Sequence, residues 1–104
     1  MTVKTKSSLK GTETRKMLIN WEMYQANGSQ GFYFCDGRYI AGITELKNTL
    51  QNISDDIFNY HVNADRNDFA NWVKDVFGLS TLSDKIRKAR SRKSLISVLE
   101  REIG

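Results

Sequence analysis

The segment that most constrains the fold is "GFYFCDGRYIAG", residues 31 to 42, in which two short apolar runs flank an Asp-Gly pair. Such a pair is a strong signal for a β-hairpin, because a two-residue type I′ turn needs positive φ at both central positions. With that turn, Phe34 would lie opposite Tyr39. Phe32 would lie opposite Ala41, and the two pairs would form one apolar face. A lone hairpin is only marginally stable in water, so other elements must cover this face.

After residue 42 the hydrophobic period changes from two to about 3.6 residues, which predicts helices rather than further strands. The clearest stripe contains Phe69, Trp72, Val73 and Phe77, and Gly78 follows as the expected C-terminal residue of that helix. Further amphipathic segments cover residues 43–53, 54–62, 81–89 and 92–103. We therefore predict an α+β, mostly helical fold, with a β-hairpin followed by about four helical segments around one small core.

The length of 104 residues and the 39% hydrophobic content provide for one domain with a modest core. Residues 1–13 are polar and basic without a period, which predicts a flexible basic arm. Residues 14–104 are then a single globular domain. Within it, residues 14–26 fit either a helix or a strand, and their spacing favours a helix.

The chain contains one cysteine, Cys35, and one histidine, His61. A single cysteine excludes an internal disulfide. One cysteine and one histidine are also too few soft ligands for a zinc site, so we expect no metal and no cofactor. We expect Cys35 to be a half-buried small hydrophobe in a reducing compartment. No run approaches eighteen apolar residues, and no apolar leader follows the N-terminus. We therefore expect a cytoplasmic protein that does not enter a membrane.

Charge is divided unevenly along the chain. Residues 1–20 carry five basic and one acidic side chain, residues 21–83 carry four and eight, and residues 84–104 carry seven and three. Cationic ends are typical of proteins that bind nucleic acid, although the cations could equally be solvated or fold back on the acidic middle. The candidate nucleic-acid-binding residues are Lys4, Lys6, Lys10, Arg15, Lys16, Lys85, Arg87, Lys88, Arg90, Arg92 and Lys93.

The histidine precedes Asp68 by seven residues, at the start of the aromatic stripe. Asn67 or Asp68 would cap the aromatic helix and bring His61 near its N-terminus. There the imidazole could pack on Phe69 or Trp72 and hydrogen-bond a carboxylate. We therefore interpret these residues as structural. In the alternative, Asp68 orients His61 as a general base, but the sequence has no nucleophile elbow, metal motif or phosphate-binding glycine loop, so we predict no catalytic residues and no enzyme.

A resemblance to a known family rests on five segments, "GFYFCDGRYIAG", "TELKNTL", "DDIFNYHV", "NDFANWVKDVFG" and "TLSDKI". Together they resemble an uncharacterised family of small prokaryotic, mainly archaeal, domains with an aromatic-x-aromatic strand, an aromatic-His pair and a D-F-x-x-W helix. The shared residues are His61, Asp68, Phe69 and Trp72. Ser83 stands where the family pattern has alanine. The resemblance covers about residues 31–90 and implies a fold but no established activity.

Two functions fit these observations. The first is a small non-enzymatic basic accessory module that binds nucleic acid or a ribonucleoprotein through its cationic ends. Arg87, Arg90 and Lys93 follow each other at three-residue spacing and would form one stripe along phosphates. The alternative is a protein-protein interaction adaptor subunit of a larger complex. On the hairpin, Tyr33 is the candidate to stack on a nucleic-acid base, on the face that would also carry Arg38 and Ile40.

Overall fold

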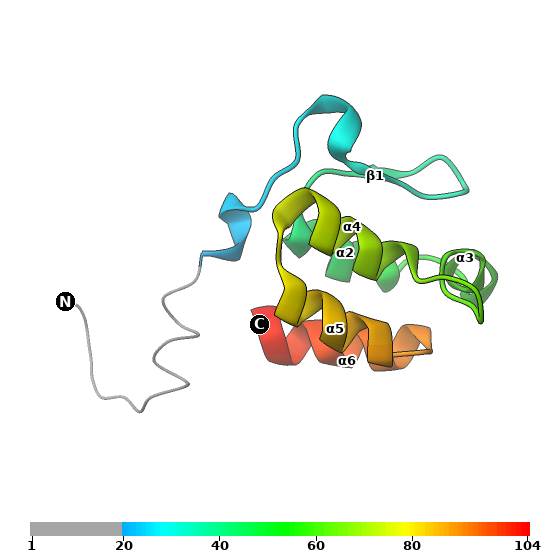
Figure 1. Ribbon diagram of the computed structural model, residues 1–104. Helices are drawn as coiled ribbons and strands as arrows, with labels where there is room; N and C mark the ends of the chain where they lie inside the picture. Colours follow the sequence, from blue (N-terminus) through cyan, green and yellow to red (C-terminus); the bar gives the residue numbers. More distant parts are fainter. Residues whose placement is uncertain (1–19) are drawn as a thin grey trace.

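The computed structural model describes residues 20–104 (Figure 1). The predicted arm over residues 1–13, with its candidates Lys4, Lys6 and Lys10, lies outside the described residues, and so do the candidates Arg15 and Lys16. The 3-10 turns η1 (Trp21–Met23) and η2 (Gly28–Gln30) precede the strands β1 (Phe32–Tyr33) and β2 (Tyr39–Ile40). The helices that follow are α2 (Ile43–Leu50), α3 (Asp55–His61), α4 (Asp68–Phe77), α5 (Ser80–Lys88) and α6 (Arg92–Ile103). The predicted fold class, α+β and mostly helical with a hairpin ahead of the helices, is confirmed, and within residues 20–104 five helices follow the hairpin where about four were predicted.

The helices lie in two levels beneath the hairpin (Figure 1). Helices α2 and α4 form the level next to the hairpin, α5 and α6 form the level below, and α3 lies at one end. Helix α4 packs on α5, α2 packs on α6, and α5 packs on α6. One continuous core fills the space between the hairpin and the two levels.

Local sequence signals define where α4 begins and ends. The Asn67 side chain accepts a hydrogen bond from the Ala70 amide at 3.0 Å, which satisfies one of the unpaired N–H groups of the first turn. Gly78 ends the helix with φ of 70°, a left-handed conformation that glycine adopts without a Cβ clash. These two residues give α4 the length that presents its whole aromatic stripe to the core.

The stripe of α4 is the centre of the core. Phe69 and Val73 are fully buried, and the Phe69 ring lies 4.9 Å from the Phe32 ring and 5.9 Å from the Phe58 ring. The Trp72 indole N–H donates to the Gln30 carbonyl at 2.9 Å and so ties α4 to η2. The aromatic helix therefore covers the apolar face that the hairpin cannot cover alone.

Small side chains let α4 and α5 approach each other closely. Ser83 of α5 is fully buried, and its hydroxyl donates to the Ala70 carbonyl of α4 at 2.8 Å. A buried hydroxyl is tolerated here because it has this partner.

The predicted hairpin is present, but its predicted register is wrong by one residue. Phe32 pairs with Ile40 and Tyr33 with Tyr39. The loop has three residues, 35 to 37, with Gly37 at φ of 97°, because the Asp-Gly pair occupies the last two loop positions instead of forming the whole loop. As a consequence Ile40 is buried and Tyr39 joins Tyr33 on the outer face, whereas the prediction placed them the other way round.

The helix predicted over residues 14–26 is also wrong for the described part of that segment. Residues 21–23 form only the single turn η1, and the chain then runs beside the end of the hairpin. The Ala26 amide donates to the Ala41 carbonyl at 2.7 Å, and Gln25 forms an antiparallel bridge with Gly42. This backbone pairing outweighs the local helical spacing, which is a weak preference that tertiary contacts override.

Replacing Phe69 by alanine tests the dependence of the fold on the aromatic stripe. Phe69→Ala should lower the free energy of unfolding by about 3–5 kcal/mol, because it removes a fully buried ring from the centre of the core. Tyr33→Ala, on the exposed face of the hairpin, is the control and should cost less than about 1 kcal/mol. Urea unfolding followed by circular dichroism measures both, and equal losses would contradict this description of the core.

Candidate functional site

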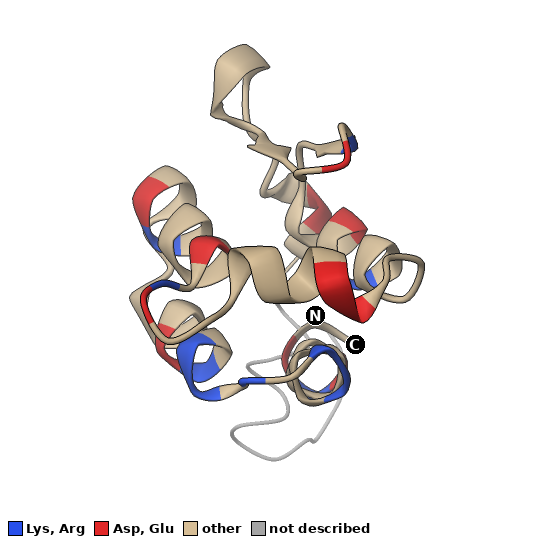
Figure 2. Cartoon of the chain, turned by 90° about the vertical axis from the view of Figure 1, so that its right-hand side faces the viewer, with Lys and Arg blue, Asp and Glu red and all other residues tan. Residues whose placement is uncertain are grey.

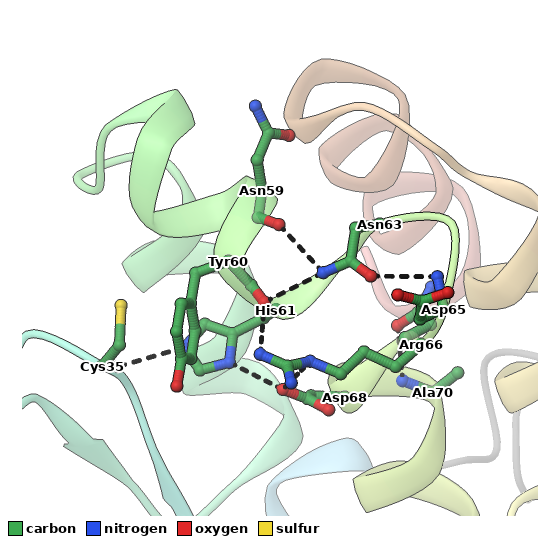
Figure 3. A network of polar contacts seen from close by, with 10 residues as sticks. Cys35, Asn59, Tyr60, His61, Asn63, Asp65, Arg66, Asp68 and Ala70 are labelled. Carbon is green, nitrogen blue, oxygen red and sulfur yellow. Dashed lines mark hydrogen bonds and ion pairs between the residues drawn. The ribbon is translucent and has the colours of Figure 1, made fainter.

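The buried histidine joins three elements (Figure 3). His61 is the last residue of α3, and its Nδ1 lies 2.9 Å from Oδ2 of Asp68 in the first turn of α4. On the other side of the ring, the backbone N–H of Cys35 at the hairpin tip donates to Nε2 at 3.0 Å. The ring also packs edge-on against Phe32. The structure thus brings together the residues that the sequence singled out around the histidine.

These two hydrogen bonds define the tautomer of His61. A backbone N–H can only donate, so Nε2 accepts and carries no proton. The proton of a neutral imidazole is then on Nδ1, which donates to the Asp68 carboxylate. The nitrogen that would take a proton from a substrate is already occupied by the Cys35 amide, and only 4% of the histidine surface is exposed.

Asp68 holds a second partner at the edge of this network. Arg66 Nε lies 3.4 Å from Asp68 Oδ2, and the Arg66 guanidinium donates to the Tyr60 carbonyl at 2.6 Å. The same guanidinium lies over the Tyr60 ring, 4.7 Å from its centre. The loop between α3 and α4 is therefore closed by an arginine whose charge is partly balanced by Asp68.

Cys35 is exposed, so the expectation of a half-buried side chain is wrong. The three-residue loop places it at the hairpin tip, where only its amide faces the interior. In Figure 3 its thiol points away from the imidazole, so the histidine and the sulfur do not form a nucleophile-base pair.

The C-terminal cations gather at one place on the molecule. Figure 2 shows Lys and Arg at the end of α5 and along the connection to α6. Two of the candidates are neutralised there, since Lys85 pairs with Glu102 at 3.1 Å and Arg92 pairs with Asp55 at 2.9 Å. Within residues 20–104, no ion pair involves the other four candidates, which are Arg87, Lys88, Arg90 and Lys93.

Three of these four cations line two concave surfaces at the end of α5. One is a cavity of about 210 Å³, which we call the arginine cavity, lined by residues 62–67 together with Arg87 and Arg90. The other is a groove of about 410 Å³ between α5 and α6, and Lys88 is one of its lining residues. The predicted single stripe of Arg87, Arg90 and Lys93 is therefore only partly formed, because Lys93 lines neither surface.

The arginine cavity contains one cation that the sequence did not single out. Arg66 lies in the acidic middle of the chain, between Asp65 and Asp68, where no charge run marks it. Only the fold of the loop at residues 62–67 brings it beside the end of α5. Its neighbour Asn67 was predicted as a helix cap and also lines the cavity.

Comparison with known protein families, curated proteins and solved structures finds no match for this chain. The resemblance to the small archaeal domains stays a prediction.

Neither a candidate metal cluster nor a candidate membrane span occurs within residues 20–104. In this part of the chain, no three His, Cys, Asp or Glu side chains are grouped so that they could hold a metal ion. Nor does any helix there combine the length and apolar character needed to span a membrane.

The tautomer of His61 gives a direct spectroscopic prediction. Nitrogen-15 NMR of the imidazole at neutral pH should show a protonated Nδ1 and an unprotonated Nε2, because the Cys35 amide donates to Nε2. The Cys35 amide should also exchange slowly with solvent. An Nε2-protonated ring or a charged imidazole would contradict the hydrogen-bond network.

His61→Phe separates the polar contacts from the ring packing. It keeps an aromatic ring in the core but leaves the Cys35 amide without its acceptor, so we expect a loss of about 1–3 kcal/mol in stability and faster exchange of that amide. The adjacent exposed residue supplies the control, since Tyr60→Phe removes only a hydroxyl and should change stability by less than about 0.5 kcal/mol. Unchanged exchange in His61→Phe would mean that the histidine does not hold the hairpin tip.

Proposed function

We propose that this chain is a small non-enzymatic module that binds nucleic acid, free or within a ribonucleoprotein, through the cationic end of α5 and the start of α6. The observation that carries the proposal is the gathering of Arg87, Lys88, Arg90 and Lys93, none of which forms an ion pair within the described residues. Cations without acidic partners are available to phosphates, and phosphate contacts dominate nucleic-acid affinity.

Charge distribution supports the same surface. Residues 20–104 carry eleven basic and eleven acidic side chains, so the positive patch is a local excess and not a reflection of net charge. The formal charge of +4 comes from residues 1–19, whose lysines and arginine are part of the proposed interface. A local positive patch attracts a polyanion over several ångströms, and the net positive charge of residues 1–19 adds to this attraction.

A purely structural role for these cations is the competing interpretation. Basic residues in the last turn of a helix interact favourably with its negative end, and α5 has Lys85, Arg87 and Lys88 there. That effect extends over the last turn only. Lys93 lies in the first turn of α6, where a positive charge is unfavourable, so helix stabilisation does not account for the whole group.

The absence of catalysis in this proposal rests on the geometry around His61. Its unprotonated nitrogen is occupied by a backbone amide, and the imidazole is buried. A general base needs an accessible nitrogen within hydrogen-bond reach of a substrate proton. A cytoplasmic location is also part of the proposal, since Cys35 is an exposed free thiol.

A protein-interaction adaptor is the second candidate, and the outer face of the hairpin favours it. Tyr33 and Tyr39 are exposed there with their ring centres 4.7 Å apart. Tyrosine is enriched at protein interfaces. Light scattering distinguishes this candidate: a dimer that Tyr33→Ser converts to a monomer would support self-association through the hairpin, whereas a monomer in both cases would speak against it.

Salt dependence tests the nucleic-acid proposal. If Arg87, Lys88, Arg90 and Lys93 each contact a phosphate, raising salt from about 50 mM to about 200 mM should lower the association constant of the full chain for an oligonucleotide by at least about 50-fold, and contacts from the cations of residues 1–19 would add to this loss. Fluorescence anisotropy with labelled single-stranded and duplex oligonucleotides measures this. Binding that is absent, or that does not change with salt, would contradict the proposal.

A matched pair of single substitutions locates the contact. Lys93→Gln should reduce the slope of log K against log salt by about 0.7–0.9, because it removes one phosphate contact. Lys74→Gln removes the same charge from the exposed side of α4, outside the proposed surface, and should leave the slope unchanged. Equal effects would mean that only the net charge of the chain matters.

A further inference from the structure

We propose that the arginine cavity is a binding pocket for one phosphate group of the nucleic acid, held by Arg87 and Arg90 against the loop of residues 62–67. The inference rests on the proposed function and adds a defined binding site for one phosphate to it. It distinguishes Arg87 and Arg90, which bind one phosphate by shape and hydrogen bonds, from Lys88 and Lys93, which act by charge alone.

The charges around the cavity favour an anion. Three arginines and one aspartate line it. Arg66 is partly balanced by Asp68, but no ion pair within residues 20–104 neutralises Arg87 or Arg90. A guanidinium presents a planar fork of N–H donors that matches a phosphate, so two such groups lining one cavity suit this ligand better than scattered surface cations do.

The walls of the cavity are formed before any ligand binds. The side-chain amide Nδ2 of Asn67 donates to the Ile86 carbonyl at 3.4 Å, which ties the loop to the end of α5. The Arg87 guanidinium donates to Asn71 Oδ1 at 3.1 Å. Both partners of Arg87 that lie within reach, Asn71 and Ser83, are neutral, so they orient the guanidinium without cancelling its charge. A preformed site binds more tightly because less freedom is lost on binding.

The loop itself is rigid for its length. Val62 and Asn67 form an antiparallel bridge, the Asn63 amide donates to the Arg66 carbonyl at 2.9 Å, and the Asp65 amide donates to Asn63 Oδ1 at 3.0 Å. These bonds fix the loop that lines the cavity together with the two arginines.

The lining also indicates which part of a nucleic acid would enter. Val62 and Ala64 are the only apolar residues around the cavity, and no aromatic ring lines it. A base needs an aromatic or apolar surface to stack on, whereas a phosphate needs charged and polar donors. The cavity therefore fits a phosphate and not a base.

The experiment titrates the full-length chain with inorganic phosphate and follows backbone amides by proton-nitrogen NMR, with chloride at matched ionic strength as the reference. We expect saturable shifts confined to residues 62–67 and 87–90. Arg87→Gln/Arg90→Gln should abolish them. Lys88→Gln/Lys93→Gln removes two positive charges as well, but neither lysine lines the cavity, so its shifts should remain. If the shifts are absent, or are lost equally in both variants, the proposal that the cavity binds phosphate is wrong.

Asp65 provides a test in the opposite direction. It is the one carboxylate that lines the cavity, so Asp65→Asn should tighten phosphate binding by about two- to fivefold through the loss of one repulsive charge. Asp75→Asn removes a carboxylate from α4 outside the cavity and serves as the control. Phosphate binding that tightens equally in both variants would contradict the assignment of this cavity as the phosphate-binding site.

Oligonucleotide binding in the same arginine and lysine variants separates this inference from the proposed function. If the arginine pair weakens oligonucleotide binding at least about tenfold more than the lysine pair does, the pocket is supported. If the two pairs weaken it equally while phosphate does not shift the cavity, nucleic-acid binding stands and the pocket is overturned. If phosphate saturates the cavity but no oligonucleotide binds, the pocket stands as an anion site and the proposed function fails.

Discussion

The structure depends on covering one face of a hairpin that is too short to be stable alone. Each strand has two residues, and the apolar side chains Phe32 and Ile40 must be buried for the pairing to persist. Helix α4 supplies that cover with Phe69 and Trp72. Once α4 lies against the hairpin, α5 can pack below it through the small residues of their contact. The position of the α5 cations on the surface follows from this stacking.

The buried imidazole of His61 adds hydrogen bonds to the apolar contact between the hairpin and α4. His61 places a donor toward Asp68 and an acceptor toward the Cys35 amide, so each nitrogen of the ring has a partner. A buried polar ring is tolerable because both nitrogens are satisfied, and such a ring links elements in one specific arrangement. The histidine thereby joins the hairpin tip, the end of α3 and the start of α4. It also fixes where the loop of residues 62–67 begins, and that loop forms one wall of the arginine cavity.

Helix α5 contributes both to the core and to the proposed binding surface. Its inner face holds Ser83 and Ile86 in the core, and its outer residues divide between a cavity on one side and a groove on the other. Two salt bridges remove Lys85 and Arg92 from the available cations. The positive charge that remains for a partner is therefore smaller, and confined to fewer residues, than the run "KIRKARSRK" suggests.

The sequence by itself determined the helices and the presence of the hairpin. The stripe of Phe69 and Trp72, the cap at Asn67 and the stop at Gly78 are local signals, and local signals act within a few residues along the chain. Tertiary packing decided the register of the hairpin. An Asp-Gly pair fits both two- and three-residue loops, and the register with the three-residue loop is the one that buries Ile40. The path of residues 20–26 and the meeting of Arg66 with Arg87 and Arg90 likewise depended on tertiary structure. They join residues that are far apart in the chain, and no periodicity in the sequence encodes such distances.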